Sequence, residues 1–205
     1  MRGATPKHLY TTKLFSCYDS TMLPLFITGN QNKVDYLSRT VGVVLPHQKI
    51  DLDEIQSKDP IVVVEHKARQ AYNLVKKPVL IEDTSLSFTA LDGLPGTFVK
   101  FFVESKDGLE TMCRMLDGFT DRSAYASAVY AYYDGTTLKI ISGQLNGTIA
   151  THPRGSGGYG WDQIFEPEGY GGLTRAELSP QQDAESYNKI RDTHALTVFL
   201  NQLGS

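Results

Sequence analysis

The sequence predicts an α/β protein of two lobes, organised around a mixed central β-sheet that helices flank. Two apolar runs, residues 23–28 and 79–81, have the length and flanking turns of buried strands, and segments with helical periodicity alternate with them. Such alternation is typical of sheets with parallel strands. Further along, residues 123–133 and 138–143 are expected to be antiparallel strands, because Asp134-Gly135 between them is a strong hairpin signal. Parallel units followed by hairpins indicate a mixed sheet, with the hairpins in the second lobe.

The composition narrows the class of protein. Of 205 residues, 40% are hydrophobic and 21% are charged, as in an ordinary globular domain. A formal net charge of −3 gives no electrostatic basis for binding nucleic acid or an anionic membrane, so we expect neither partner. No apolar run approaches the roughly 20 residues needed to cross a bilayer. Cys17 and Cys113 form neither a metal motif nor a disulfide framework, which favours a reducing, cytoplasmic location.

Residues 1–21 are expected to be an N-terminal extension outside the fold. They are rich in Thr, Ser and Tyr without a hydrophobic period, and they lack the apolar segment of a secretory signal. A disordered tail is the favoured interpretation, and organellar targeting by a transit-type peptide stays open. Residues 22–205 are then predicted to form a single two-lobed domain.

The remaining elements follow from periodicity and end signals. From Pro60 to residue 77 the pattern predicts a helix, with Asp59 as its N-cap and Pro60 in its first turn. The β-branched start of this segment favours a strand locally, but the longer helical pattern overrides it. We further expect helices at 34–39, 107–116 and 181–203, a helix or turn at 100–103, and strands at 43–50, 144–150 and 164–165.

The stretch from Val79 to Phe98 is the centre of the predicted site. The apolar run at 79–81 continues directly into Glu82-Asp83-Thr84, so carboxylates are expected where a strand ends, at the edge where open α/β sheets bind ligands. Neighbouring carboxylates suit Mg²⁺, a hard cation that often bridges to substrate phosphates. A solvated turn after a strand is the alternative. The rigid turn at residues 93–96 favours the wall of a site.

A second polar cluster begins where the first strand ends. Residues 29–33, Gly-Asn-Gln-Asn-Lys, connect that strand to a helix. A Gly-Asn loop at a helix N-terminus with an early lysine attracts phosphate through backbone N–H groups, the helix dipole and the ammonium. The spacing is not that of a P-loop, and a simple helix cap is the alternative. Lys67 is either an exposed lysine or a further phosphate contact.

Residues 153–162 form the second informative loop. Four glycines around Arg154 allow the backbone to approach a ligand closely. Tyr159 and Trp161 can stack on a planar ring, and Asp162 can accept hydrogen bonds from ring or exocyclic N–H donors. A flexible hairpin loop around a buried Trp161 is the alternative.

These motifs together resemble those of the inosine/xanthosine triphosphate pyrophosphatase family. The matching segments, in the family's order, are TGNxxK at 28–33, the acidic turn at 51–54, VLIEDTSL at 79–86, GLPGTFVK at 93–100 and YGWD at 159–162. The resemblance covers about residues 23–203. It implies a two-lobed α/β fold with a long mixed sheet, a homodimer, and Mg²⁺-dependent hydrolysis of deaminated purine nucleoside triphosphates (ITP, dITP, XTP) to the monophosphate and pyrophosphate.

The resemblance also implies roles for individual residues. Asp83 would orient or deprotonate the attacking water with Glu82 beside it, and Glu54 and Asp83 would hold Mg²⁺. The residues that would bind the substrate are Thr28, Asn30, Lys33, Lys67, Thr84, Lys100, Tyr159, Trp161 and Asp162.

The C-terminal helix departs from the family's pattern. The family carries Ser-His-Arg there, and the His-Arg pair contacts the 6-oxo group of the purine, but no such pair occurs between Tyr187 and Leu196. Lys189, Arg191 or His194 would have to replace it. Arg191 and His194 are three residues apart, so we expect them to share a helix face and to bind the base together. The departure leaves two alternatives, a pyrophosphatase of altered base preference and a non-catalytic nucleotide-binding protein.

Overall fold

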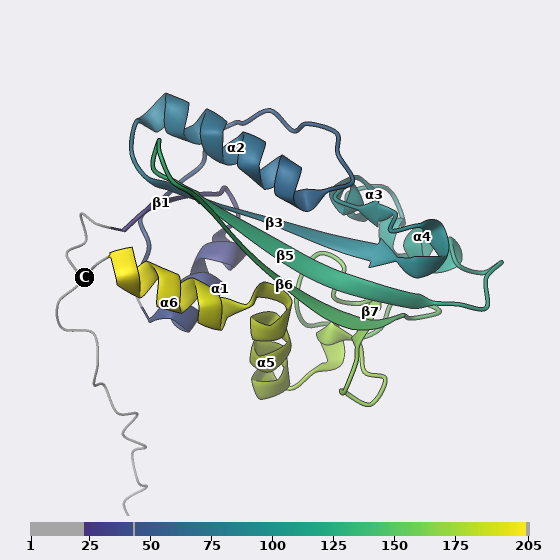
Figure 1. Cartoon of the computed structure of the whole chain (residues 1–205). Coiled ribbons are helices and arrows are strands. Elements are labelled where there is room, and N and C mark those ends of the chain that lie inside the picture. Colours follow the sequence, from purple (N-terminus) through teal and green to yellow (C-terminus); the bar gives the residue numbers. More distant parts are fainter. Residues whose placement is uncertain (1–22, 43, 204–205) are drawn as a thin grey trace, which may run out of the picture.

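The computed structural model describes residues 23–42 and 44–203, in which one mixed sheet of seven strands has helices on both faces (Figure 1). The strand order is β2-β1-β3-β5-β6-β7, and the short β4 also pairs with β3. β1 is parallel to β2 and to β3, whereas the other pairings are antiparallel. The predicted mixed α/β sheet is therefore confirmed, and the prediction for residues 1–21 lies outside the described residues.

The element bounds are as follows. The strands are β1 Leu25–Ile27, β2 His47–Gln48, β3 Val79–Phe88, β4 Pro95–Gly96, β5 Ser123–Tyr133, β6 Leu138–Ile149 and β7 Phe165–Pro167. The helices are α1 Gln31–Val41, α2 Pro60–Val75, α3 Val99–Val103, α4 Gly108–Arg114, α5 Pro180–Arg191 and α6 Thr193–Leu203, with short 3₁₀ helices η1 Thr89–Leu91 and η2 Arg175–Glu177. None of the helices within these residues is both long enough and apolar enough to span a membrane.

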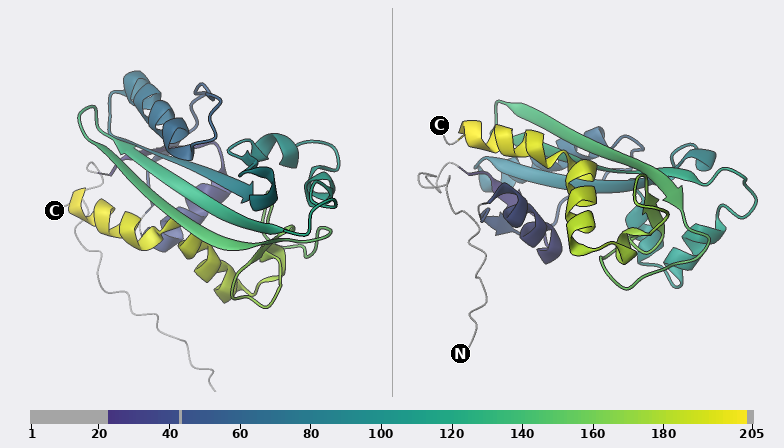
Figure 2. Two further views of the ribbon diagram at one scale, coloured as in Figure 1. Left: turned by 45° about the vertical axis from the view of Figure 1, so that its right-hand side comes forward. Right: turned by 90° about the horizontal axis from the view of Figure 1, so that it is seen from below.

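Helices cover the two faces of the sheet unequally. α2 lies on one face, and α1, α5 and α6 lie on the other (Figures 1 and 2). α2 begins as predicted, because the Asp59 carboxylate accepts a hydrogen bond from the backbone N–H of Ile61 at 2.8 Å. Its small residues Ala68 and Ala71 are fully buried in the cluster that Val79 and Ile81 join from β3. Small side chains on this face of α2 let the helix lie close to the strand.

Separate hydrophobic clusters define the two lobes. In the first lobe, Phe26 and Leu80 of the sheet pack with residues of α1 and α6. In the second, Leu86 and Phe88 at the far end of β3 pack with Trp161 and with residues of α3 and α4, which lie beside that end of the strand in Figure 1. The long strands β3, β5 and β6 run through both lobes and join them.

The sheet has an opening beside β3. One edge of β3 pairs with β5 from Val79 to Phe88. The other edge pairs with β1 near Leu80 and with β4 from Leu86, and no strand pairing of the described residues covers the stretch 82–85 between them. The expectation that the strand ends at residue 81 is therefore wrong, because β5 holds it extended to Phe88. Glu82, Asp83 and Thr84 lie inside a strand, at the place where its other neighbour is missing.

Three other boundaries differ from the sequence prediction. The strand expected at 43–50 is reduced to β2, although the carbonyl of Pro46 still accepts a hydrogen bond from Phe26 N–H at 2.8 Å; residue 43 lies outside the described residues. The strand expected at 144–150 is the continuation of β6. The helix expected at 34–39 begins earlier, at Gln31, because the Asn30 side chain caps it.

The C-terminal helix is divided in two, contrary to the single helix expected at 181–203. Asp192 adopts a left-handed conformation (φ 41°) that ends α5, and its carboxylate accepts a hydrogen bond from Ala195 N–H at 3.2 Å at the start of α6. The end of α5 lies directly on β6 at Gly143. A Cβ at that glycine would be 2.4 Å from the backbone nitrogen of Asp192, so only glycine permits this approach.

Candidate active site

A cavity of about 740 Å³ lies at the opening beside β3. Side chains from both lobes line it: those at the start of α1, those on α2 and β3, those on α3, and those in the loop at 159–162. With one exception, His194, every predicted site residue lines this cavity, including Thr84 and the exposed Lys100. The structure therefore brings together motifs that are far apart in the sequence.

The start of α1 forms a cationic end of the cavity. The Thr28 hydroxyl accepts a hydrogen bond from Asn30 N–H at 3.1 Å, and the Asn30 side chain accepts one from Asn32 N–H at 3.0 Å. Lys33, in the first turn of α1, donates to the backbone carbonyl of Glu82 at 3.2 Å, on the open stretch of β3. A helix N-terminus and an ammonium directed at one place make a site for an anion such as phosphate.

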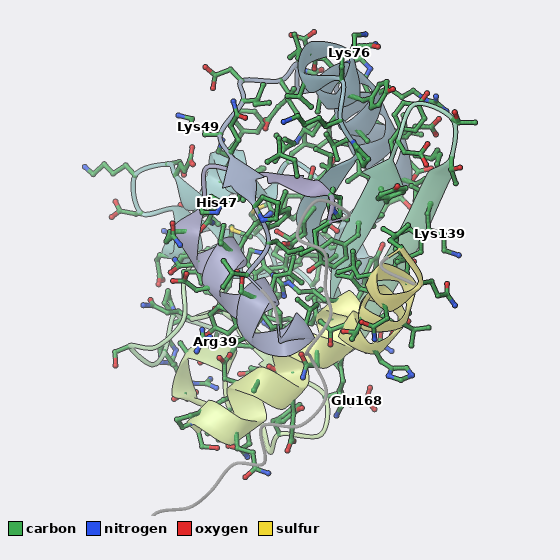
Figure 3. The ribbon with its side chains drawn as sticks, turned by 90° about the vertical axis from the view of Figure 1, so that its left-hand side faces the viewer. Arg39, His47, Lys49, Lys76, Lys139 and Glu168 are labelled. Atoms are coloured by element: carbon green, nitrogen blue, oxygen red, sulfur yellow. The ribbon has the colours of Figure 1, made fainter. Side chains whose placement is uncertain are left out.

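Lys49 adds a further cation that the sequence interpretation missed. It follows β2 directly, and its aliphatic stem passes over Gly29, where a Cβ would come within 3.0 Å of the Lys49 Cδ (Figure 3). Because β1 and β2 are parallel, the residues after both strands meet at one edge of the sheet. Lys49 was missed because a strand was expected over 43–50, which put this lysine inside the strand. In the structure β2 ends at Gln48, so Lys49 follows the strand.

Lys67 joins two of the predicted metal ligands. Its ammonium lies 3.3 Å from the Glu54 carboxylate and 3.3 Å from the Asp83 carboxylate. The Lys67 and Asp83 side chains are 14% and 22% exposed and so have limited access to water, whereas the Glu54 side chain is 51% exposed. Lys67 is thus a cavity residue and not a plain surface lysine.

Glu54 and Asp83 fit a magnesium ion held jointly with a phosphate-bearing ligand. Both carboxylates point at one position that already stabilises a positive charge, the Lys67 ammonium. Within residues 23–42 and 44–203, no group of three or more His, Cys, Asp or Glu side chains could hold a metal ion by itself. Mg²⁺ commonly binds through one or two carboxylates and completes its shell with water and substrate phosphates, which matches this donor set.

Glu82 is separated from Asp83. Successive residues of a strand face opposite sides of the sheet, so Asp83 faces Lys67 on α2 while Glu82 faces α5. There the Glu82 carboxylate accepts a hydrogen bond from Arg191 Nε at 3.0 Å, and both side chains are almost fully buried. The expected position of Glu82 beside Asp83, next to the same water, is not what the structure shows.

Arg191 is fixed by aromatic neighbours as well as by Glu82. Its Nη2 lies 3.4 Å from the Tyr159 hydroxyl, and its guanidinium carbon lies 3.7 Å from the centre of the Tyr187 ring. Burial by itself would lower the pKa of Arg191, but the charge of Glu82 and the neighbouring Tyr187, Tyr130 and Tyr159 hydroxyls together outweigh it, and the pKa is raised. Arg191 Nη1 is buried and has no hydrogen-bond partner among the described residues. Arg191 thus lines the cavity with one guanidinium nitrogen that no described residue pairs.

The loop at 159–162 forms a further part of the cavity wall. Trp161 is 7% exposed and packs edge-on against Phe165, with ring centres 5.7 Å apart, so it is both a core residue and part of the wall. The Asp162 carboxylate accepts hydrogen bonds from Tyr159 N–H at 2.9 Å and from Arg175 Nη1 at 3.0 Å. Burial raises the pKa of Asp162, and the positive charge of Arg175 opposes that rise.

Arg175 is the main cavity residue that the sequence interpretation missed. It lies in η2, is 5% exposed, and donates to Asp162, to Ser186 and to Asp183. Asp183 in turn accepts a hydrogen bond from the Tyr36 hydroxyl of α1 at 2.7 Å. The only sequence signal was the Thr174-x-x-Glu177 pattern of a capping box, which fixes η2 but does not indicate the direction of the arginine.

His194 does not reach the cavity, and the prediction that it shares a face with Arg191 is wrong. The left-handed residue Asp192 ends α5 directly after Arg191, so His194 begins a different helix and is exposed. Lys189 is also exposed, with its ammonium 5.1 Å from the Tyr170 ring centre. Of the three candidates on the C-terminal segment, only Arg191 lines the cavity.

Comparisons with known proteins agree with this geometry. The family model described as the Ham1 family matches residues 24–196. An inosine triphosphate pyrophosphatase of Batrachochytrium dendrobatidis is 46% identical over 151 residues, which cover 71% of this chain and 77% of that protein. One of Yarrowia lipolytica is 38% identical over 184 residues, covering 87% and 96%. The structure of a HAM1 protein from Coxiella burnetii superimposes with a TM-score of 0.75 at 25% identity, covering 87% of this chain and 98% of that one. The chain belongs to the Ham1 family.

Proposed function

We propose that this protein hydrolyses deaminated purine nucleoside triphosphates, ITP, dITP and XTP, to the monophosphate and pyrophosphate. One observation carries the proposal: a single cavity joins a cationic end at α1 and α2 to an aromatic, hydrogen-bonding end at residues 159–162. The first end suits a triphosphate and the second suits a base. The inosine triphosphate pyrophosphatase names of the relatives support the same substrate class. A non-catalytic protein is not favoured, because Lys67 and both acidic residues, Glu54 and Asp83, line the cavity together.

The residues divide the chemistry between them. Water attacks a phosphorus atom of the triphosphate, the bond between the α- and β-phosphates breaks, and pyrophosphate leaves. Asp83 orients that water or accepts its proton, while Lys33, Lys49 and Lys67 neutralise phosphate charge. Glu54 and Asp83 would hold Mg²⁺, which when bound stabilises the negative charge that develops on the phosphate oxygens. Phosphoryl transfer requires mainly such positioning and charge neutralisation.

Base recognition is assigned to the other end of the cavity. Tyr159 and Trp161 offer ring faces for stacking. The unpartnered Nη1 of Arg191 supplies the donor that a 6-oxo group requires, and so replaces the family's His-Arg pair without His194. A buried donor left without a partner favours a ligand that satisfies it.

The test is pyrophosphate release from ITP, XTP, ATP and GTP by the purified full chain, with Mg²⁺ and with excess chelator. We expect release from the oxo-purine nucleotides in Mg²⁺ and its loss with chelator. Equal turnover of ITP and ATP would contradict the assigned substrate class, and turnover that survives chelation would contradict the metal assignment.

The homodimer expected from the family resemblance and the cytoplasmic location expected from the cysteine content belong to the same proposal. The molar mass of the purified protein by light scattering tests the first. The distribution of the tagged full-length chain in cells tests the second, and a signal confined to an organelle would assign a targeting role to residues 1–21.

A further inference from the structure

We propose that Arg175 is a positioning residue that holds Asp162 as an oriented carboxylate and thereby makes the site select bases with a ring N–H. The inference rests on the proposed function, since it concerns how the same site distinguishes purines. It goes further in assigning selectivity to a residue outside the recognised motifs. Arg175 is not part of the C-terminal segment in which the family's His-Arg pair occurs.

The first step concerns the geometry of the Asp162 carboxylate. Its two oxygens accept from different donors, Oδ1 from Arg175 Nη1 at 3.0 Å and Oδ2 from Tyr159 N–H at 2.9 Å. The side chains of Asp162 and Arg175 are 5% and 4% exposed, so neither group can exchange these partners for water. Asp162 thus has one fixed orientation at the cavity wall, with lone pairs left for a ligand.

The second step concerns Arg175 itself, which is held from three sides. Its Nε donates to the Ser186 hydroxyl at 3.1 Å, and its Nη2 donates to Asp183. The capping box at η2 fixes the backbone on which it stands. The guanidinium therefore has two carboxylate neighbours, Asp162 and Asp183, and serves as the shared counter-ion of both. Removing it leaves the buried Asp162 and the partly exposed Asp183 without the cation that they share.

The third step is the charge of Asp162 when a base arrives. The groups that face it are Arg175 from η2, Asp183 and Arg191 from α5, and Tyr159 from its own loop; Tyr36 of α1 reaches Asp183. Burial raises the pKa of Asp162, and the negative charge of Asp183 raises it further. The positive charges of Arg175 and Arg191 and the hydrogen bond from Tyr159 N–H lower it. Without Arg175 the pKa rises further, which favours the neutral form of the acid, a form that can donate a hydrogen bond.

The fourth step connects that charge to the base. Hypoxanthine and xanthine carry a hydrogen on N1, which a carboxylate accepts. Adenine presents a bare N1 with a lone pair, which a carboxylate repels and a protonated acid or an amide can bind. A site built on a buried hydrogen bond rejects the mismatched ligand strongly, because its polar atoms stay unpaired. Arg175 therefore controls whether the pocket prefers the N1–H form or the bare N1 form.

The experiment compares kcat/KM for ITP and ATP, over a range of pH, in four variants of the full chain. We expect Arg175→Met to lower the ITP/ATP ratio of kcat/KM by at least about tenfold and to move the acid limb of the ITP profile to higher pH. Asp162→Asn should lower the ratio similarly, and the double variant should lower it no further than Asp162→Asn, since both changes act through one carboxylate. Arg175→Lys keeps the charge and should restore most of the ratio.

Arg122→Met is the matched control. Arg122 is also a partly buried arginine, which donates to the backbone carbonyls of Ile149 at 2.8 Å and Cys113 at 2.9 Å, but it does not line the cavity. We expect it to leave the ITP/ATP ratio unchanged. An equal fall for both nucleotides in Arg175→Met, with an unmoved pH profile, would reduce Arg175 to a structural role and overturn the inference.

Three further results separate the inference from its premise. An unchanged ratio in Asp162→Asn would overturn the inference even if Arg175→Met failed to fold. A wild-type protein that releases no pyrophosphate from any nucleotide would overturn the proposed function and the inference with it. A wild type that prefers ITP, together with an unaltered ratio in both variants, would overturn the inference alone.

Discussion

Gly143→Ala should destabilise the protein and impair the base-binding end of the cavity together. Gly143 lies in β6 directly beneath the end of α5. An added Cβ would lie 2.4 Å from the backbone nitrogen of Asp192, 2.7 Å from the carbonyl carbon of Arg191 and 2.7 Å from the carbonyl oxygen of Ile190. All three are backbone atoms, so no side-chain rotation relieves the overlap. Carbon atoms in contact normally sit about 3.5–4.0 Å apart, so the helix end must retreat by roughly 1 Å.

The expected size follows from this overlap. Forcing extra volume into a packed contact costs about 1–3 kcal/mol. For a protein of this size each kcal/mol lowers Tm by about 2–4 °C, so a fall of about 2–12 °C is expected by calorimetry. The same retreat draws Arg191 away from Glu82 and Tyr159. Since a misplacement of about 1 Å can cost about 10²-fold in rate, kcat/KM for ITP should fall by up to that factor.

The matched control is Gly118→Ala, where an added Cβ would meet nothing within 4 Å. Its unfolding free energy should stay within about 0.5 kcal/mol of wild type, with unchanged ITP hydrolysis. A Gly143→Ala protein that unfolds like wild type and hydrolyses ITP normally would refute the argument. It would show that the end of α5 can move without consequence for stability or for Arg191.

Three other predictions follow from the described contacts. Asp83→Asn should lower kcat by at least about 10²-fold in steady-state assays, and near-normal turnover would remove Asp83 from the catalytic role. Lys33→Ala and Lys67→Ala should each raise KM, as added salt should for the wild type. The control Lys139→Ala removes an exposed lysine at the start of β6 and should leave KM unchanged. Equal KM values in all three variants would contradict a cationic end of the cavity. Asp134 accepts hydrogen bonds from Thr137 and Thr136 N–H at 2.7 and 2.9 Å, which lower its pKa. The stabilising effect of Asp134 is therefore present above its unfolded-state pKa of about 3.9 and is lost as pH falls through the folded-state value. We expect Asp134→Ala to lower the free energy of unfolding near neutral pH but to change it little in strong acid, as measured by urea unfolding at each pH.

Local patterns predicted the elements whose signals are contained in a few residues. Asp59-Pro60 marked the start of α2, Asp134-Gly135 marked the hairpin, and Asn30 lies where α1 begins. The cavity residues that belong to these elements were found for the same reason. Such signals act on the backbone within one turn, so a few neighbouring residues are enough to identify them.

Features that depend on distant partners could not be predicted in this way. Glu82-Asp83-Thr84 has the composition of a turn, yet β5 keeps it extended, and Arg191 and Lys67 neutralise its two acids from opposite faces of the sheet. Arg175 gave no signal because its carboxylate partners are 8 and 13 positions away on other elements. The break at Asp192 was hidden because the apolar positions of α6 continue the pattern of α5.

The long strands shared by the two lobes limit how the cavity can close around a ligand. A hinge needs a few backbone residues that absorb a large change in φ and ψ, but β3, β5 and β6 cross between the lobes as one hydrogen-bonded ladder. The lobes can approach only through a change in the twist and bend of that ladder, with small displacements spread over many residues. Hydrogen exchange should therefore show ligand-induced protection at α1 and in the loop at 159–162, while the amides at the centre of β5 exchange slowly with or without nucleotide.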